Sequence, residues 1–312
     1  MTPILTLTLN PAVDKSTRVQ NIVPEKKLHC EAPKYEPGGG GINVSRALKR
    51  LRTESIAIFP AAGRTGELLR ELLAKEEIEQ RVVETANETR ENFAVVDISN
   101  NQQYRFGLPG PEILAAEGDQ FIPLMRSLSP QWLVMSGSLA PGLETDFYAR
   151  IASVLKKQEV RIILDTSGDA LRLAVDEGVY LIKPNLGELS KMIGVESLDH
   201  ESVEEAAKEL IAKGKCEIVV VSMGAQGAWL VSRDIAEHVP TPTVKKQSTI
   251  GAGDSMVAGM VHQLAKGAGL REVVRMGVAC GTAATMNPGT ELFKKEDAEK
   301  LYQWLLQKDL PR

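Results

Sequence analysis

From residue 132 to residue 222 the sequence alternates short apolar runs with longer mixed segments, and this rhythm constrains the fold more than any other feature. The apolar runs predict strands at 132–136, 160–165, 179–182 and 218–222. The segments between them predict helices at 144–157, after Ser167, after Asn185 and at 202–213. Strands that alternate with helices favour right-handed crossovers and a largely parallel sheet, so the chain is predicted to be an α/β protein.

The rest of the chain adds strands at the beginning and helices at the end. Strands are expected at 4–9 and 55–60, and helices from Ile42 and over 66–76, 252–266, 270–286 and 295–307. Two half-polar segments, 92–97 and 103–108, predict a hairpin in a small sheet apart from the main one. Because no linker or low-complexity tract interrupts the sequence, we expect one domain over residues 1–312.

The composition excludes several classes of protein. The net charge is −4, so there is no basic excess to hold a nucleic-acid backbone. No run of about 18 apolar residues is present for a membrane span, and residues 1–10 lack the features of a signal peptide. The three cysteines are far apart and odd in number, which favours reduced thiols. We therefore expect a cytoplasmic protein that binds neither nucleic acid nor membrane.

A run of small residues from Ser248 to Met256 carries a carboxylate, Asp254, at the predicted start of a helix. Small residues let backbone amides approach an anion closely, and the first turn of a helix directs free N–H groups and a positive dipole end toward it. A carboxylate beside such a site suggests a general base that takes a proton from an attacking hydroxyl. A glycine-rich turn with Asp254 as a helix cap is the alternative.

Four consecutive glycines, Gly38–Gly41, are followed by Asn43 at the start of another predicted helix. Such a run costs backbone entropy, which suits a place where the main chain passes close to a ligand. The Asn43 amide can both donate and accept hydrogen bonds, as sugar hydroxyls require. A flexible loop is the alternative. The sequence contains neither the P-loop pattern of nucleotide-binding proteins nor the glycine pattern of dinucleotide sites.

Further polar residues stand where predicted strands end. Asn185 and Glu188 are three residues apart and share a helix face, so they suit Mg²⁺ or, alternatively, a helix cap with an acidic first turn. Polar and glycine residues also follow other strands, at Asp14, at 136–138 and at 222–227. Parallel sheets bind ligands at the carboxyl ends of their strands, so these positions are candidates for one site.

Three cations are candidates for binding a phosphate group on a substrate: Lys27, Arg90 and Arg105. Solvated surface charges are the alternative for each of them.

Together, these segments resemble the ribokinase/PfkB family of carbohydrate kinases. The motifs TLNPAVD (8–14), GGGGINVSRAL (38–48), Lys183-Pro184-Asn185 with Glu188, and GAGDSMVAGM (251–260) occur in the order and spacing of that family. The resemblance covers essentially the whole chain. It implies a ribokinase-like three-layer α/β/α sandwich, with a mostly parallel central sheet and a small β lid drawn from about 12–36 and 89–108.

Within the family, the TLNPAVD opening resembles the branch that acts on phosphorylated hexoses. The GGGG run, residues 103–106 and residues 245–256 are most similar to the minor bacterial type of 6-phosphofructokinase. This resemblance implies ATP-dependent conversion of fructose 6-phosphate to fructose 1,6-bisphosphate. Alternatives are 1-phosphofructokinase and tagatose-6-phosphate kinase activities. A non-catalytic sugar or nucleotide sensor on the same fold is a further rival, but the intact Asp254, Glu188 and glycines argue against it.

The resemblance also assigns roles to individual residues. It makes Asp254 the general base and the amides of Gly251, Ala252 and Gly253 the anion hole. It assigns the sugar phosphate to Asp14, Lys27, Gly39, Gly40, Asn43, Arg90, Arg105 and Ser138. It assigns the nucleotide to Lys183, Asn185, Ser222, Gly224 and Gly227. It assigns Mg²⁺ to Glu188 and Asn185, directly or through water, and K⁺ to the region of Ser248, Ile250, Ala284, Asn287 and Gly289.

Relatives in this family often pair their lids, so a homodimer through the lid is expected. One position departs from the family pattern: His29 stands two residues after Lys27, where another cationic group is expected. A histidine there predicts weaker or pH-dependent binding of the substrate phosphate.

Overall fold

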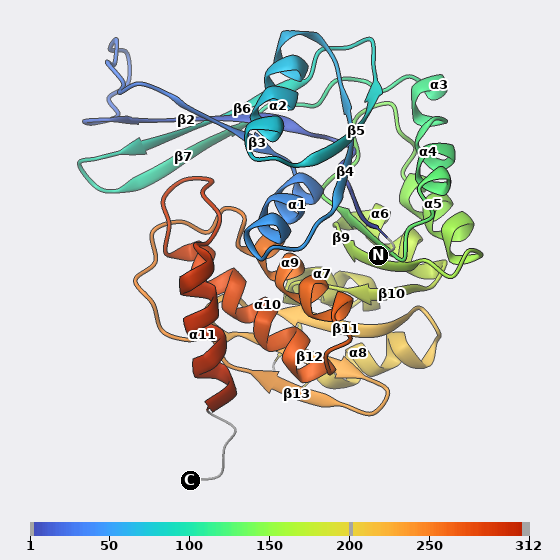
Figure 1. Ribbon diagram of the computed structural model, residues 1–312. Coiled ribbons are helices and arrows are strands. Elements are labelled where there is room, and N and C mark those ends of the chain that lie inside the picture. Colours follow the sequence, from blue (N-terminus) through green and yellow to red (C-terminus); the bar gives the residue numbers. More distant parts are fainter. Residues whose placement is uncertain (1–2, 200–201, 308–312) are drawn as a thin grey trace.

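The computed structural model describes residues 3–199 and 202–307, which build a central sheet between two helical layers (Figure 1). The strands of the central sheet are β1 (Ile4–Leu7), β4 (Ile56–Ala61), β5 (Glu79–Glu84), β8 (Trp132–Ser136), β9 (Arg161–Asp165), β10 (Val179–Ile182), β11 (Cys216–Ser222), β12 (Ala228–Ser232) and β13 (Ala236–Val239). Their order is β13-β12-β11-β10-β9-β8-β1-β4-β5. Neighbours run parallel except that β12 is antiparallel to β11 and β13, so the α/β prediction is confirmed.

Helices cover both faces of this sheet. They are α1 (Gly40–Arg50), α2 (Gly63–Lys75), α3 (Ala115–Gly118), α4 (Phe121–Ser127), α5 (Phe147–Lys156), α6 (Gly168–Asp176), α7 (Leu186–Ile193), α8 (Val203–Ala212), α9 (Ala252–Ala265), α10 (Leu270–Thr285) and α11 (Lys295–Gln307), with a 3₁₀ turn, η1, at Gly224–Gln226. Helices α4 to α8 share one apolar core with the sheet, α1 and α9 to α11 share a second, and α2 packs in a smaller third core with β4. The result is the expected three-layer sandwich.

Alternation along the strands sends side chains into the two cores. In β8, Leu133 and Met135 belong to the core shared with α4 to α8, whereas Trp132 and Val134 belong to the core shared with α1 and α9 to α11. All four are buried. A strand buried on both faces reads as a continuous apolar run, which is why these strands are recognisable in the sequence.

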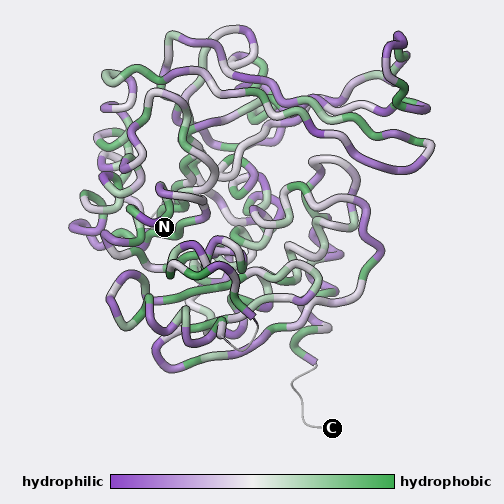
Figure 2. Tube along the Cα trace, turned by 180° about the vertical axis from the view of Figure 1, so that it is seen from behind, coloured by the Kyte–Doolittle hydropathy of each residue, from purple (hydrophilic) through white to green (hydrophobic). Residues whose placement is uncertain are grey.

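A second, four-stranded sheet projects from the body (Figure 1). Its strands are β2 (Ala12–Val19), β3 (Lys34–Gly38), β6 (Arg90–Asp97) and β7 (Gln102–Gly107). The order is β3-β2-β6-β7, with β2 and β6 parallel and the outer pairs antiparallel. The separate small sheet agrees with the expected fold class, and we refer to these four strands as the lid sheet. Hydrophobic residues recur along its projecting part (Figure 2).

Several elements were not predicted. Strand β5 is mostly polar because it lies at an edge of the sheet, and its sequence, EQRVVE, gives little apolar signal. Strands β12 and β13 are short and follow a turn at residues 224–227, and helices α3 and α4 fall in a segment for which no element was expected. The first strand also ends at Leu7 rather than residue 9. Among the described residues, no helix combines the length and apolar character needed to cross a membrane.

Candidate active site

The candidate site lies where strands β8, β9 and β10 end and helices α1 and α9 begin. These strands end at or next to Ser136, Asp165 and Lys183, and all three side chains act on Asp254 in the first turn of α9. The three strands are parallel neighbours, so their carboxyl ends meet at one edge of the sheet. This edge is where open α/β sheets bind ligands.

Asp254 is half-buried and accepts a hydrogen bond of 2.9 Å from Asn43 Nδ2 of α1. Burial, followed by the charge of Asp165, raises the pKa of Asp254 to about 6, although Asn43, Lys183 and Ser136 oppose the shift. A carboxyl group with this pKa is largely ionised at neutral pH, yet it binds a proton far better than an ordinary aspartate. Both properties suit a general base. The structure thus brings together two predicted residues, Asn43 and Asp254, that are 211 positions apart in the sequence.

Lys183 forms a buried ion pair with Asp165, with 3.0 Å between Nζ and Oδ1. Burial works against the charge of Lys183, but Asp165 more than compensates and raises the pKa of the lysine. Lys183 therefore stays a cation, and a Cβ atom added to Gly253 would lie 3.5 Å from its Nζ. The sequence assigns Lys183 to the nucleotide, and the structure places its charge close to Asp254. Ser136 lies in the segment 136–138 that the sequence proposed as a strand-end candidate, whereas Asp165 was not predicted as a site residue, although it ends a strand that the sequence predicts.

The glycine run lets α1 begin close to the sheet. A Cβ atom at Gly40 would approach Ser136 Oγ to 2.3 Å, and one at Gly39, whose φ is 115°, would approach Thr8 Cγ2 to 2.5 Å. Larger residues at these positions would push α1, and Asn43 with it, away from Asp254. On α9, the cap residue Gly251 has a left-handed backbone with φ 70°, which orients the following amides around the helix start.

A cavity of about 260 Å³ lies between the lid sheet and the body, and it contains three of the predicted substrate-binding residues. Asp14, Arg90 and Arg105 line it together with Ile250 and Thr290 of the body. Asp14 accepts a hydrogen bond from Asn92, and burial raises its pKa. Arg105 lies 3.4 Å from Thr249 Oγ1, immediately before the glycine run of α9.

Arg90 is held by backbone oxygen atoms. Its two terminal nitrogens donate to the carbonyls of Leu108 and Asn10, each at 2.9 Å. Carbonyl partners fix the guanidinium without neutralising it, so its charge remains available to an anion.

Five of the eight residues predicted for the sugar phosphate do not line this cavity: Lys27, Gly39, Gly40, Asn43 and Ser138. Lys27 and His29 are exposed on the loop between β2 and β3, and neither lines the cavity. Ser138 is also exposed and accepts a hydrogen bond from Asn10 at 3.2 Å, on the side of the site nearest β8. A single copy of the chain therefore does not gather all the residues predicted for the sugar phosphate.

A second cavity, of about 430 Å³ and mostly apolar in lining, reaches the start of α9 from the other side. Its lining includes three residues predicted for the nucleotide, Ser222, Gly224 and Gly227. It also includes Ala252 and Gly253, which were predicted for the anion hole. Gly227 has φ 96°, and a Cβ atom there would lie 2.0 Å from the Val239 carbonyl oxygen. An apolar cavity that ends at a helix N-terminus can hold a flat base and direct phosphates toward the amides.

Asn185 and Glu188 form a reciprocal helix cap at the start of α7. Asn185 Oδ1 accepts from the Glu188 amide and Glu188 Oε2 accepts from the Asn185 amide, both at 2.9 Å. The capping alternative is thus present in the structure. Glu188 keeps its other oxygen atom outside this pair, and its charge acts on Lys183, so the carboxylate faces the site. This donor set still fits Mg²⁺ or one of its water ligands.

The residues predicted for K⁺ lie in the last turn of α10, in the loop that follows it and in the segment before α9. Ser248 Oγ donates to the Gly289 carbonyl at 2.8 Å and accepts from the Ile250 amide at 3.2 Å. The Asn287 amide donates to the Ala284 carbonyl at 3.2 Å. Ser248 therefore links the segment before α9 to the loop after α10. The backbone carbonyls of these segments are the kind of donor that a monovalent cation uses.

An aspartate of raised pKa in the first turn of a helix, with one cavity reaching Gly253 and another reaching Ile250, is an arrangement that suits phosphoryl transfer on an α/β sheet. The model of the pfkB family carbohydrate kinases matches residues 6–297. The chain is 45% identical over 310 residues to ATP-dependent 6-phosphofructokinase isozyme 2 of Escherichia coli, covering 98% of this chain and 99% of the relative. It is 34% identical to 1-phosphofructokinase of Bacillus subtilis, covering 94% and 96%. The chain belongs to the pfkB family of carbohydrate kinases.

Solved structures of phosphofructokinase-2 from Escherichia coli share this fold. One is described in complex with potassium, one in complex with fructose-6-phosphate, and one as a tetrameric inhibited form. Their TM-scores are 0.95, 0.93 and 0.92, at 44%, 43% and 43% identity. The first two matches cover 98% of this chain and 100% of the solved chain.

Proposed function

We propose that this chain is an ATP-dependent kinase that converts fructose 6-phosphate to fructose 1,6-bisphosphate. The observation that carries the proposal is Asp254, which accepts a hydrogen bond from Asn43 in the first turn of α9. Beside this turn, Ile250 lines a cavity shared with Asp14, Arg90 and Arg105, and Gly253 lines the second cavity. The 45% identity to a 6-phosphofructokinase, against 34% to a 1-phosphofructokinase, favours this substrate over its isomer.

In the reaction, the C1 hydroxyl of the sugar attacks the γ-phosphorus of ATP, the new bond forms to that oxygen, and ADP leaves. The hydroxyl is too weak an acid to ionise beforehand at neutral pH. Asp254 accepts its proton as the bond to phosphorus forms. The amides of Gly251, Ala252 and Gly253 and the cation Lys183 stabilise the charge that develops on the transferring group.

Asp14, Gly39, Gly40 and Asn43 hold the sugar hydroxyls, and Arg90 and Arg105 hold its phosphate. Ser222, Gly224 and Gly227 hold the nucleotide. Mg²⁺ would be held through Glu188 and Asn185 and would neutralise the nucleotide phosphates, and K⁺ would lie among the carbonyls near Ser248 and Gly289.

Lys27 enters this scheme through a second copy of the chain. Its exposed loop lies outside the cavity of its own chain, so a role in phosphate binding requires another lid to bring it there. We propose a homodimer through the lid sheet, with one kinase domain over 1–312 in each copy and a lid drawn from about 12–36 and 89–108. The reduced thiols and a phosphorylated sugar substrate favour the cytoplasm.

A coupled assay of ADP release across a panel of sugars tests the function. We expect turnover with fructose 6-phosphate to exceed turnover with fructose 1-phosphate, tagatose 6-phosphate and unphosphorylated sugars. Preference for fructose 1-phosphate or tagatose 6-phosphate would reassign the substrate within the family. Tight ATP binding without turnover of any sugar would instead identify a sensor on the same fold.

A further inference from the structure

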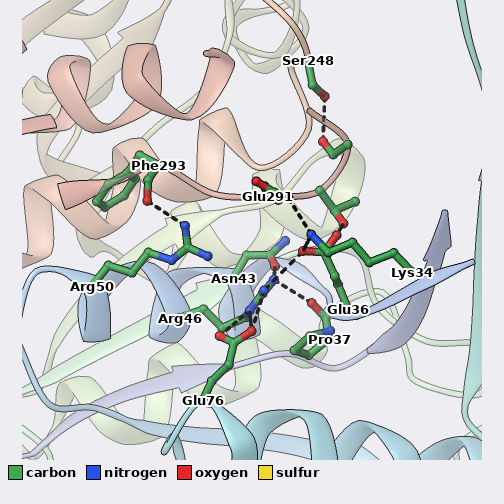
Figure 3. A network of polar contacts seen from close by, with 12 residues as sticks. Lys34, Glu36, Pro37, Asn43, Arg46, Arg50, Glu76, Ser248, Glu291 and Phe293 are labelled. Atoms are coloured by element: carbon green, nitrogen blue, oxygen red, sulfur yellow. Dashed lines mark hydrogen bonds and ion pairs between the residues drawn. The ribbon is translucent and has the colours of Figure 1, made fainter. Parts of the chain in front are cut away.

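The side chain of Arg46 is buried beneath the candidate site, although it touches neither cavity. It is 2% exposed and lies in α1, one turn after Asn43. Its Nε and Nη2 atoms bond the Glu76 carboxylate, with the nearest contact at 2.7 Å. Its Nη1 atom donates to the Pro37 carbonyl at 3.0 Å and to Asn43 Oδ1 at 3.4 Å (Figure 3). Arg46 is thus a buried cation that contacts Asn43, the residue that donates a hydrogen bond to Asp254, and packing alone does not explain this contact.

The Asn43 amide lies between Arg46 and Asp254. Its oxygen faces the guanidinium and its nitrogen donates to the aspartate. An asparagine amide can turn by 180° at little steric cost and exchange its donor and acceptor ends. Which end faces Asp254 decides whether Asn43 stabilises the ionised or the protonated carboxyl.

Arginine has five donors and no acceptor, and it remains charged at any ordinary pH. A turned Asn43 would place its NH₂ group against the guanidinium and lose that acceptor. We propose that Arg46 is a positioning residue that fixes the Asn43 amide with its donor end toward Asp254, so that Asn43 favours the ionised, proton-accepting form of the base. This proposal rests on the proposed function only in taking Asp254 as that base.

Arg46 and Asp254, which Asn43 connects, are surrounded by different charged groups. Asp165 and Lys183 act on Asp254. Arg46 is surrounded by Glu76 after α2, Glu36 of β3, Asp14 of β2 and Arg50 of its own helix. Removing Arg46 alone would leave Glu76 without its partner and would mix a charge effect with an orientation effect.

Through its hydrogen bond to the Pro37 carbonyl, Arg46 also positions a strand of the lid sheet, β3. Pro37 precedes Gly38, and a Cβ atom at Gly38 would lie 2.5 Å from Asp14 Oδ2. Glu36, beside it, accepts a hydrogen bond from Thr290 and pairs with Lys34 at 3.2 Å. Arg46 thus holds the end of β3 and the Asn43 amide with one nitrogen atom.

The test uses the charge-balanced variant Arg46→Met/Glu76→Gln in the full chain. Its main readout is the titration of the Asp254 carboxyl carbon by NMR in aspartate-labelled protein, assigned with Asp254→Asn. Without Arg46 the amide can turn and accept a hydrogen bond from the protonated carboxyl. We expect the Asp254 pKa to rise by about one unit, the scale of one hydrogen bond to a charged group.

The acid limb of the kcat profile should move upward by the same amount, whereas the KM for ATP should stay unchanged. Placing the same double change on Asn43→Ala should add no further shift, because the amide is already gone. An unchanged titration in the double variant, or a full second shift on Asn43→Ala, would overturn the proposal.

Two controls separate the other outcomes. Should the methionine variant fail to fold, Arg46→Gln/Glu76→Gln keeps paired amides in place of the ion pair, and we expect the same rise in the Asp254 pKa. Since the NMR titration needs no turnover, absence of kinase activity would count against the proposed function while leaving the positioning of Asn43 directly measurable.

Discussion

At the scale of single residues, the pKa of Asp254 is set by the groups that surround it. Burial and the neighbouring Asp165 make its proton harder to lose, whereas Asn43, Lys183 and Ser136 pull in the opposite direction. The balance leaves the carboxyl ionised at neutral pH but ready to bind a proton. Lys183 and Asp165 compensate each other, so neither charge is left unpaired beside the base.

Replacing the base tests its role most directly. We expect Asp254→Asn to lower kcat by roughly 10² to 10⁴, the usual span for loss of a general base. Its melting temperature should not fall, because a carboxyl whose pKa is raised in the folded state costs stability when ionised at neutral pH. Steady-state kinetics and calorimetry measure both quantities. Activity within threefold of the wild type would refute the assignment.

The pH dependence follows from the same group. The pKa of Asp254 is about 6, so the base should be ionised above that pH and protonated below it. We expect kcat to be nearly constant above pH 7 and to fall as the pH drops through about 6. A pH profile at saturating substrates checks this, with Asp254→Asn as the control that lacks the limb. An acid limb near pH 4 would mean that the burial of Asp254 is relieved when substrates bind.

At the scale of elements, the candidate site is built largely from the first turns of helices. Helices α1, α7 and α9 all begin at the carboxyl edge of the sheet, and each presents a residue that the sequence assigned to ligand binding. The glycines at α1 and α9 are required by close approach or by a left-handed backbone. The cap of α7 shows that one pair of side chains can serve the helix and still leave a carboxylate oxygen for a cation.

Two substitutions at Glu188 separate these roles. Glutamine can still accept the hydrogen bond from the Asn185 amide, so Glu188→Gln should keep the melting temperature but raise the Mg²⁺ concentration needed for half-maximal rate. Glu188→Ala should do the same and also lose roughly 0.5 to 2 kcal/mol of stability with the cap. Thermal unfolding and Mg²⁺ titration of the rate distinguish them. An unchanged Mg²⁺ requirement in both variants would leave Glu188 as a cap alone.

At the scale of the whole molecule, the lid sheet is a part on which a single copy exposes large apolar side chains. Tyr35, Tyr104, Phe106 and Leu108 are exposed on it, and β7 is an edge strand. Apolar side chains on a projecting sheet with a free edge are typical of a surface that a partner covers. Lys27 lies on the same sheet's loop, away from the cavity of its own chain.

A charge placed on this surface should weaken the proposed homodimer. We expect Tyr104→Glu to shift the chain toward monomer in sedimentation, and to raise the KM for fructose 6-phosphate more than the KM for ATP. Trp304→Glu is the matched control, since Trp304 has the same exposed fraction, 37%, but lies on α11. A dimer that survives Tyr104→Glu and dissociates with Trp304→Glu would place the interface on the other side of the molecule.

The sequence by itself determined the family, the alternation of the central strands and helices, and the small separate sheet, and these predictions are confirmed. Apolar runs and glycine motifs are local patterns, so they can be recognised without a structure. Edge strand β5 and strands β12 and β13 were not predicted from the sequence, because short or polar strands carry little periodic signal. The roles assigned to the site residues stay predictions.

Only the tertiary structure decided which of those residues meet. It placed Asn43 and Ser136 against Asp254, added Asp165 to them, and left Lys27 on an exposed loop. It also exposed the buried contacts of Arg46, which no motif suggested. The distance between two residues two hundred positions apart depends on the order of the strands in the sheet. That order results from the packing of the whole chain and not from any local sequence pattern.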